Sequence, residues 1–279
     1  MLKFFPLIIL IIFLNSCSEN TVKNSVLKER SLELQVLEAY EEGKNSLEQG
    51  DVLYAAKKFN EAEVLFPQSE WAPKSALMAA YSYYSQDYYG DSLEELKRFV
   101  KVYPKYKDVD YAYYLMGLSY YEQIVDETKD LESIINAKKT FSFLIKNYPN
   151  TDYALDADFK IDLINDILAS KEMYIGRYYL QRKKWIPAIN RFKTVIDEYE
   201  TTIYTEEALY RLVEVYYKIG LVNEASKYAK LLGYNYQSSE WYEKSYELFD
   251  KSYAKNKKKL ERKNKSIIKK IKSLADWNE

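Results

Sequence analysis

Histidine is absent from this chain of 279 residues, and its one cysteine is Cys17. Without histidine and with a single thiol, the chain cannot form Ser-His-Asp or Cys-His catalytic arrangements, histidine-ligated zinc sites or an internal disulfide. Glycine and proline are scarce as well, with 7 and 6 residues, so few turns can be built from them. We therefore expect a protein that is not an enzyme and that has no catalytic residue, metal site or cofactor.

The positive and negative charges nearly balance, with 41 Lys and Arg residues against 42 Asp and Glu residues. A net charge of −1 does not favour nucleic acid as a partner. The distribution is uneven, because residues 251–279 hold 11 basic and 3 acidic residues, a net charge of +8, whereas residues 17–250 carry −10. The chain is also rich in tyrosine, with 30 residues whose apolar ring and polar hydroxyl suit binding surfaces.

The amino terminus predicts the cellular compartment. Lys3 precedes an apolar run from Phe4 to Leu14, which as a helix spans about 16 Å, too short for the roughly 30 Å of membrane hydrocarbon. A positive residue, a short apolar run and then small residues are typical of a secretory signal peptide, here residues 1–16. Leu14-Asn15-Ser16-Cys17 resembles the bacterial lipobox, so we expect an acylated Cys17 as the membrane anchor and residues 17–36 as a lipid-anchored linker. The alternative is an ordinary signal peptide cut near the same point.

A pattern of five residues recurs in phase along the chain. It starts with a small residue and continues with a small residue, a bulky residue, an apolar residue and a proline at offsets 12, 16, 19 and 24. The copies are Gly43, Ala55, Phe59, Ala62, Pro67; Ala80, Ser92, Leu96, Phe99, Pro104; Gly176, Ala188, Phe192, Val195, with Glu200 in place of proline; and, more weakly, Val213, Ala225, Ala229, Leu232. The pattern resembles the tetratricopeptide repeat, in which the small residue lies where helix A meets helix B and the proline ends helix B. We predict an all-α solenoid of about five helix-turn-helix repeats over residues 37–240.

The spacing of the repeats is irregular at one place. A further copy starts at Gly117, but its later members, Ala137, Phe141, Leu144 and Pro149, lie eight residues beyond the expected positions. This shift predicts an insertion between the two helices of repeat three, in Val125 to Ser133. Another 14 extra residues precede Gly176, in a stretch with helical apolar spacing and no other glycine or proline. These residues predict one long helix in the middle of the solenoid.

Stacked repeats of this kind present a concave groove lined by their A helices, so binding is the expected activity. Projecting the repeat pattern onto these helices places a cluster of tyrosines in the groove of repeats two and three: Tyr81, Tyr84, Tyr111, Tyr114 and Tyr121. Flat rings and hydroxyls suit an extended peptide with alternating aromatic and polar residues. The alternative is that several of these tyrosines only pack between neighbouring helices.

The last segment, residues 241–279, is predicted to be a basic carboxy-terminal helix or tail. On a helix its apolar residues share one face, with lysines on the other: Leu260, Ile267, Ile268, Ile271 and Leu274. A basic amphipathic segment of this kind can bind anionic lipid or an acidic partner. The alternative is a solvated extension.

Three stretches of the solenoid make the chain resemble the BamD family, the tetratricopeptide lipoproteins of the outer-membrane β-barrel assembly machinery. They are Val109-Asp110-Tyr111 with Met116-Gly117-Leu118, Tyr148-Pro149-Asn150-Thr151-Asp152-Tyr153, and Trp185-Ile186-Pro187-Ala188 with Asn190-Arg191. The resemblance covers roughly Leu37 to Tyr236 and includes the stretched third repeat. Glu200 and the lysine-rich tail depart from the family pattern.

The resemblance implies a lipoprotein that is anchored in the outer membrane, faces the periplasm and helps to insert β-barrel proteins. Its implied partners are a BamA-type β-barrel insertase, other lipoproteins of the assembly complex, unfolded outer-membrane proteins, and the membrane itself through lipid on Cys17. It also places Asn190 and Arg191 on the surface that docks the BamA-type partner, although Arg191 can instead pair within its own repeat. The alternative function is that of another periplasmic tetratricopeptide lipoprotein, one that scaffolds cell-wall or envelope-division machinery.

Overall fold

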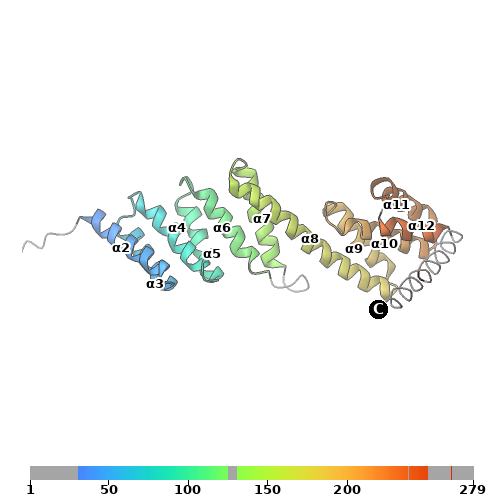
Figure 1. Ribbon diagram of the computed structural model, residues 1–279, viewed down its shortest axis with the longest axis horizontal. Coiled ribbons are helices and arrows are strands. Elements are labelled where there is room, and N and C mark those ends of the chain that lie inside the picture. Colours follow the sequence, from blue (N-terminus) through green and yellow to red (C-terminus); the bar gives the residue numbers. More distant parts are fainter. Residues whose placement is uncertain (1–30, 125–130, 238, 251–264, 266–279) are drawn as a thin grey trace, which may run out of the picture.

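The computed structural model describes residues 31–124, 131–237 and 239–250, together with residue 265. In these ranges the chain forms eleven α-helices and no β-strand (Figure 1). The helices are α2 (Leu32–Glu48), α3 (Val52–Leu65), α4 (Trp71–Tyr84), α5 (Tyr89–Val102), α6 (Val109–Tyr121), α7 (Glu132–Asn147), α8 (Asp152–Gln181), α9 (Trp185–Glu198), α10 (Thr205–Lys218), α11 (Val222–Asn235) and α12 (Glu240–Phe249). The predicted signal peptide, Cys17 and the lysine-rich stretch from residue 251 onward lie outside the described residues, apart from residue 265.

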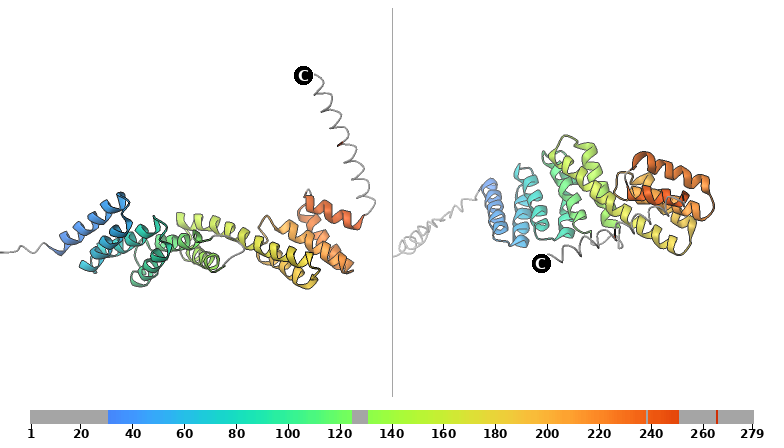
Figure 2. Two further views of the ribbon diagram at one scale, coloured as in Figure 1. Left: turned by 90° about the horizontal axis from the view of Figure 1, so that it is seen from below. Right: turned by 45° about the vertical axis from the view of Figure 1, so that its right-hand side comes forward.

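The helices stack in chain order along one elongated row (Figures 1 and 2). From α2 to α11 each helix packs against the next one in the chain, which gives five helix pairs, and α12 packs against α10 and α11. This architecture confirms the predicted all-α repeat solenoid. Its first helix begins at Leu32, five residues before the predicted start, and α12 closes the last repeat although the sequence placed it within the basic tail. Trp241, Tyr242 and Leu248 of α12 pack on the core, and these apolar contacts make the helix part of the solenoid.

In three of the repeats the small residue is a glycine, and it lies against a phenylalanine of the following helix. A Cβ atom added to Gly117 would lie 2.4 Å from Cε1 of Phe141, and one added to Gly176 would lie 2.5 Å from Cε1 of Phe192. Both phenylalanines are completely buried. Glycine is therefore required at these positions because the aromatic ring occupies the space of a side chain.

The turn inside four of the five repeats uses a left-handed residue seven positions after the small residue. These turn residues have positive φ angles: Gly50 (84°), Asp87 (65°), Lys183 (57°) and Gly220 (85°). In repeat three the corresponding position falls within the ten residues between α6 and α7, where the sequence predicted an insertion. The same turn recurs at the same position of these repeats, so they share a local backbone geometry as well as a residue pattern.

Helix α8 has 30 residues and is about 45 Å long. Thr151 caps its amino terminus, because the Thr151 hydroxyl accepts a hydrogen bond from the backbone N–H of Ala154 at 3.2 Å. Its first half packs against α7 and α6, and its second half forms the first helix of repeat four with α9. The predicted long helix is thus confirmed, and it separates the first three repeats from the last two. Among the described residues, no helix has the length and apolar character needed to cross a membrane.

Candidate functional site

The first part of the site is a hollow of about 370 Å³ between α4, α6 and the start of α8. Its walls are mainly rings and aliphatic side chains, with one cation and one carboxylate: Lys74, Leu77, Met78, Tyr81, Tyr106, Asp108, Tyr111 and Tyr153. Two of the predicted groove residues, Tyr81 and Tyr111, thus face the same hollow although they lie 30 residues apart. A mostly apolar hollow with a few polar groups is the kind of surface that receives a side chain of a ligand.

Tyr111 and Tyr114 of α6 share a neighbour, Tyr153, in the first turn of α8. Ring centroids are 5.3 Å apart for Tyr111 and Tyr153, and 5.1 Å apart for the stacked pair Tyr114 and Tyr153. The Tyr114 hydroxyl donates a hydrogen bond of 2.6 Å to Oδ2 of Asp156. Burial raises the pKa of Tyr111, and burial together with this hydrogen bond raises the pKa of Tyr114. These rings are therefore held in place by α8 and act as neutral hydroxyls at physiological pH.

The remaining two predicted tyrosines flank this cluster. The ring of Tyr84 lies 5.8 Å from that of Tyr89, and burial raises the pKa of Tyr84. Tyr121 lies ten residues after Tyr111 on α6, and Nζ of Lys160 is 4.8 Å from its ring centroid. All five predicted tyrosines are partly buried: Tyr81, Tyr84, Tyr111, Tyr114 and Tyr121. Each of them packs on a helical core cluster and also keeps part of its surface in solvent, so packing and contact with a ligand are compatible.

A second hollow of about 660 Å³ adjoins the first at the amino-terminal end of α4. Lys74 and Tyr106 line both hollows, so the two form one continuous surface. Nζ of Lys74 lies 4.8 Å from the ring centroid of Tyr40 and 4.7 Å from that of Trp71. Contact with these rings holds the ammonium group in the groove, where it is available to an anionic group of a ligand.

Tyr106 and Tyr153 are groove residues that the repeat pattern did not single out. Tyr106 lies between α5 and α6 and Tyr153 lies in the first turn of α8, so neither occupies one of the projected groove positions on an A helix. The signal that was available for Tyr153 is its place in the Tyr148-Pro149-Asn150-Thr151-Asp152-Tyr153 stretch. Only the packing of α8 beside α6 brings it to the cluster.

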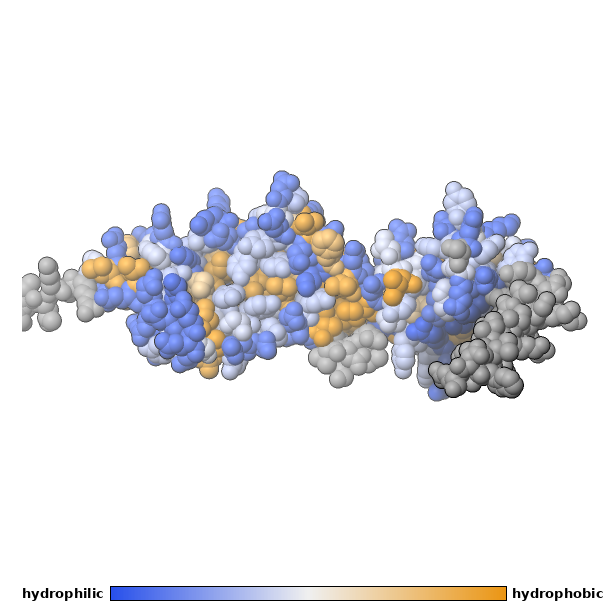
Figure 3. Space-filling model, viewed as in Figure 1, coloured by the Kyte–Doolittle hydropathy of each residue, from blue (hydrophilic) through white to orange (hydrophobic). Residues whose placement is uncertain are grey.

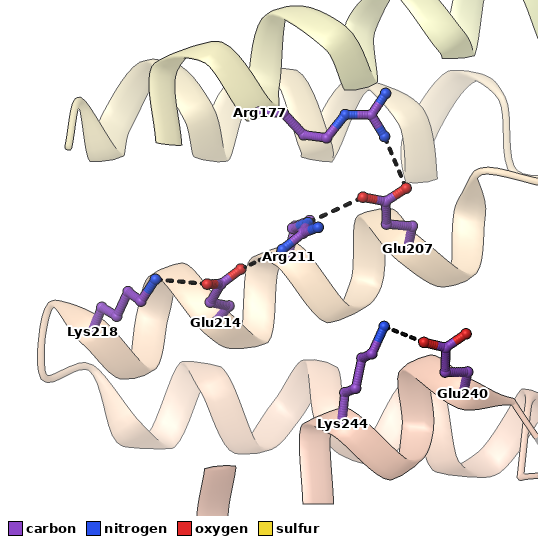
Figure 4. A network of polar contacts seen from close by, with 7 residues as sticks. All are labelled: Arg177, Glu207, Arg211, Glu214, Lys218, Glu240 and Lys244. Carbon is purple, nitrogen blue, oxygen red and sulfur yellow. Dashed lines mark hydrogen bonds and ion pairs between the residues drawn. The ribbon is translucent and has the colours of Figure 1, made fainter. Parts of the chain in front are cut away.

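The groove of repeats four and five has a different chemistry, shown in Figure 4. Alternating charges form one chain of ion pairs: Arg177 Nη1 to Glu207 Oε2 (2.9 Å), Glu207 Oε1 to Arg211 Nε (3.1 Å), Arg211 Nη1 to Glu214 Oε2 (2.8 Å) and Glu214 Oε1 to Lys218 Nζ (2.6 Å). Hydrogen bonds from Lys218 and Arg211 lower the pKa of Glu214 against the opposing effect of burial. The two halves of the solenoid thus offer an aromatic surface and a charged surface.

Asn190 and Arg191 lie on α9, in repeat four. Nη1 of Arg191 donates to both carboxylate oxygens of Glu172 on α8, at 3.0 Å each, so the arginine is paired within its own repeat. Asn190 is exposed, and its backbone oxygen accepts a hydrogen bond of 3.1 Å from the Thr194 hydroxyl. Arg191 remains partly exposed, and its role in docking a partner stays a prediction. In the described part of the chain, no group of acidic or cysteine side chains is arranged to hold a metal ion.

Comparison with known proteins gives a consistent family. A family described as outer membrane lipoprotein matches residues 33–231. The outer membrane protein assembly factor BamD of Rickettsia prowazekii is 45% identical over 207 residues, which are 74% of this chain and 82% of that protein. BamD of Caulobacter vibrioides is 42% identical over 221 residues, 79% of this chain and 71% of that protein. Among solved structures, a complex of the TPR2AB domain of yeast Sti1 is similar over 76% of this chain and 82% of that one, at 12% identity and a TM-score of 0.41.

Proposed function

This chain belongs to the BamD family of outer membrane lipoproteins, and from that premise we propose that it is a scaffold of the β-barrel assembly complex. It binds unfolded barrel proteins and a BamA-type insertase and so promotes insertion into the outer membrane. The observation that carries this proposal is the 45% identity to an outer membrane protein assembly factor over 82% of that protein's length. The elongated solenoid supports it, because stacked repeats present long surfaces on which two partners can bind together.

The scaffold is proposed to be held at the membrane by lipid on Cys17, facing the periplasm. The single cysteine of the chain falls at the one position where a lipobox requires it. Several acyl chains, each contributing about 0.8 kcal/mol per buried CH₂ group, hold a protein on a membrane stably. Ser18 follows the cysteine, which is consistent with transfer to the outer membrane.

The aromatic groove of repeats two and three is the proposed receiving surface for unfolded barrel proteins. The last strand of such a substrate is an extended segment with alternating aromatic side chains and a terminal carboxylate. The hollow beside Tyr81 and Tyr111 accepts an aromatic side chain, and the ammonium group of Lys74 in the same hollow attracts a carboxylate. Aromatic contacts of about 0.5–1.5 kcal/mol each give moderate affinity, which allows the substrate to be handed on.

The carboxy-terminal repeats are the proposed docking site for the BamA-type partner. Asn190 is exposed on α9 and Arg191 beside it is partly exposed, so both are accessible to a partner. A guanidinium group can bind a carboxylate of the partner through two parallel hydrogen bonds. When a partner carboxylate takes the place of Glu172 beside Arg191, the charge of the arginine remains paired. Substrate binding and partner docking then occupy opposite halves of the solenoid.

Co-purification of the lipoprotein from detergent-solubilised membranes tests this function. The tagged chain is expected to retain a BamA-type barrel protein and further lipoproteins of the assembly complex. Recovery of cell-wall or division proteins in place of a barrel protein would reject the proposal. A tagged Cys17→Ala chain provides the matched control for partners that bind only through the shared membrane.

A further inference from the structure

Helix α8 carries a stripe of large apolar side chains that stand in solvent. Leu155, Phe159 and Leu163 follow one another at intervals of four residues and are 62%, 63% and 49% exposed. Figure 3 shows apolar surface gathered in the middle of the molecule, where α7 and α8 lie in Figure 1. A contiguous apolar stripe on a helix marks a surface that binds another segment. We call Leu155, Phe159 and Leu163, with their acidic neighbours, the α8 ridge.

The acidic neighbours form a second stripe beside the first. Asp158 and Asp162 each precede an apolar residue of the ridge, and Asp166 continues the same spacing. Residues 152–167 contain five aspartates and one lysine, a net charge of −4. Within the ranges that the structure covers, none of these three aspartates has an ion-pair partner. The ridge therefore combines apolar contact area with uncompensated negative charge.

This combination selects the chemistry of the occupant. An anionic membrane surface is repelled by the aspartates, and a second copy of α8 would bring two acidic stripes together. A basic amphipathic segment satisfies both requirements, because its apolar face covers the exposed side chains and its cations neutralise the aspartates.

We propose that the occupant is the carboxy-terminal segment of the same chain, residues 255–274. This segment holds ten basic residues and one acidic residue, a net charge of +9. Its apolar face from Leu260 to Leu274 would span about 21 Å as a helix, and the apolar and acidic stripes of the ridge, from Leu155 to Asp166, span about 17 Å. The lengths and the charges of the two surfaces match.

The end of α12 lies within reach of the ridge. The ring of Phe249 is 5.5 Å from that of Tyr217, close to the end of α10. A hollow lined by Gln181 and Lys218, among other residues, joins the carboxyl ends of α8 and α10. Arg177 lines the same hollow, and it lies five helical turns, or 18 residues, after Phe159, so the ridge shares the face of α8 that borders the hollow.

The connecting chain is long enough for this path. From Gln181 back to Ile167 the distance along α8 is about 21 Å. The ten residue steps from Asp250 to Leu260 cover about 33 Å when extended, which leaves about 12 Å for the step from the end of α12 to Gln181, whereas the same steps as a helix cover only about 15 Å and would not reach. The segment can therefore run antiparallel to α8, with Leu260 near Ile167 and Leu274 near Leu155.

Photocrosslinking in the full-length lipoprotein, purified in detergent, tests the docking. Benzoylphenylalanine replaces Phe159, and in a matched control it replaces Val64, which is 74% exposed on α3. We expect crosslinks from position 159 to residues 251–279 that are independent of protein concentration, and at least fivefold fewer from position 64. The double change Asp158→Lys and Asp162→Lys is expected to lower the yield of crosslinks from position 159 to residues 251–279 at least fivefold. Replacing Lys269, Lys270 and Lys272 by Glu in the same double variant should restore this yield.

Two results would overturn the proposal. One is a yield of crosslinks to residues 251–279 that is no higher from position 159 than from position 64. The other is a crosslink from position 159 to a second copy of the chain, to lipid or to another protein, with none to residues 251–279. A circular dichroism spectrum measured for each variant separates loss of docking from loss of the fold.

Discussion

Replacing Gly117 by Ala should destabilise the solenoid through one identified contact. The added Cβ would lie 2.4, 2.6 and 2.9 Å from three ring atoms of Phe141, against 3.4–4 Å for an ordinary contact. Phe141 is completely buried, so its ring cannot turn into solvent. Overpacking of this kind costs about 1–3 kcal/mol, and Ala for Gly inside a helix returns about 0.5–1 kcal/mol. We expect a net loss of about 1–2 kcal/mol, or roughly 2–8 °C in thermal midpoint.

The assay is thermal and urea unfolding followed by circular dichroism, with Gly90→Ala as the matched control. Gly90 is also helical, but an added Cβ meets no atom within 4 Å, so this variant is expected to be as stable as the parent or slightly more stable. A second change, Phe141→Leu, should make Gly117→Ala less costly, because the smaller side chain frees the space. If Gly117→Ala and Gly90→Ala are equally stable, the repeat does not require a small residue at position 117 to make room for the Phe141 ring, and the reasoning is refuted.

Three further predictions concern the anchor, the docking surface and the pH dependence of stability. Cys17→Ala should move the protein from the membrane to the soluble fraction, and retention of this variant in membranes would contradict lipid anchoring. Arg191→Glu should lower co-purification of the barrel partner without changing circular dichroism, whereas unaltered recovery would reject the docking role. Because burial raises the folded-state pKa of Tyr111 and Tyr114 above the usual 10.0, the stability that they contribute is complete below pH 10 and falls as the pH rises further. Urea unfolding measures the free energy of unfolding at pH 9 and at pH 11. The decrease between these pH values should be smaller for the double variant Tyr111→Phe, Tyr114→Phe than for the parent protein, and an equal decrease would contradict this assignment.

The architecture could be predicted because it depends on contacts that repeat. The small residue, the bulky residue and the helix end recur at fixed offsets, so several copies support one interpretation of the fold. The long helix followed from counting residues between Pro149 and Gly176 in a stretch without turn formers. The end of the solenoid was placed too early because α12 mixes Trp241 and Leu248 with charged residues, and only its packing on α10 and α11 shows which face is buried.

The site could be predicted in outline but not in its contacts. Projection of the repeat pattern placed Tyr81 and Tyr111 in the groove, because both hold defined positions on A helices. In the structure both residues line one hollow. It did not find Tyr106, which reaches the groove from the loop between α5 and α6. It left open whether Arg191 binds a partner protein or pairs within its own repeat, and Glu172 is identified only by the packing of α9 on the second half of α8.

The measurement that tests the central claim most directly is the binding of a barrel-derived carboxy-terminal peptide to the aromatic groove. Replacing Tyr81, Tyr84 and Tyr114 together by Ala removes three rings worth about 0.5–1.5 kcal/mol each beyond their buried area, so affinity should fall at least tenfold. Circular dichroism would verify that the variant remains folded, and photocrosslinkers at these three positions should capture the peptide. Crosslinks confined to repeats four and five, with unchanged affinity of the triple variant, would contradict the claim that repeats two and three receive the substrate.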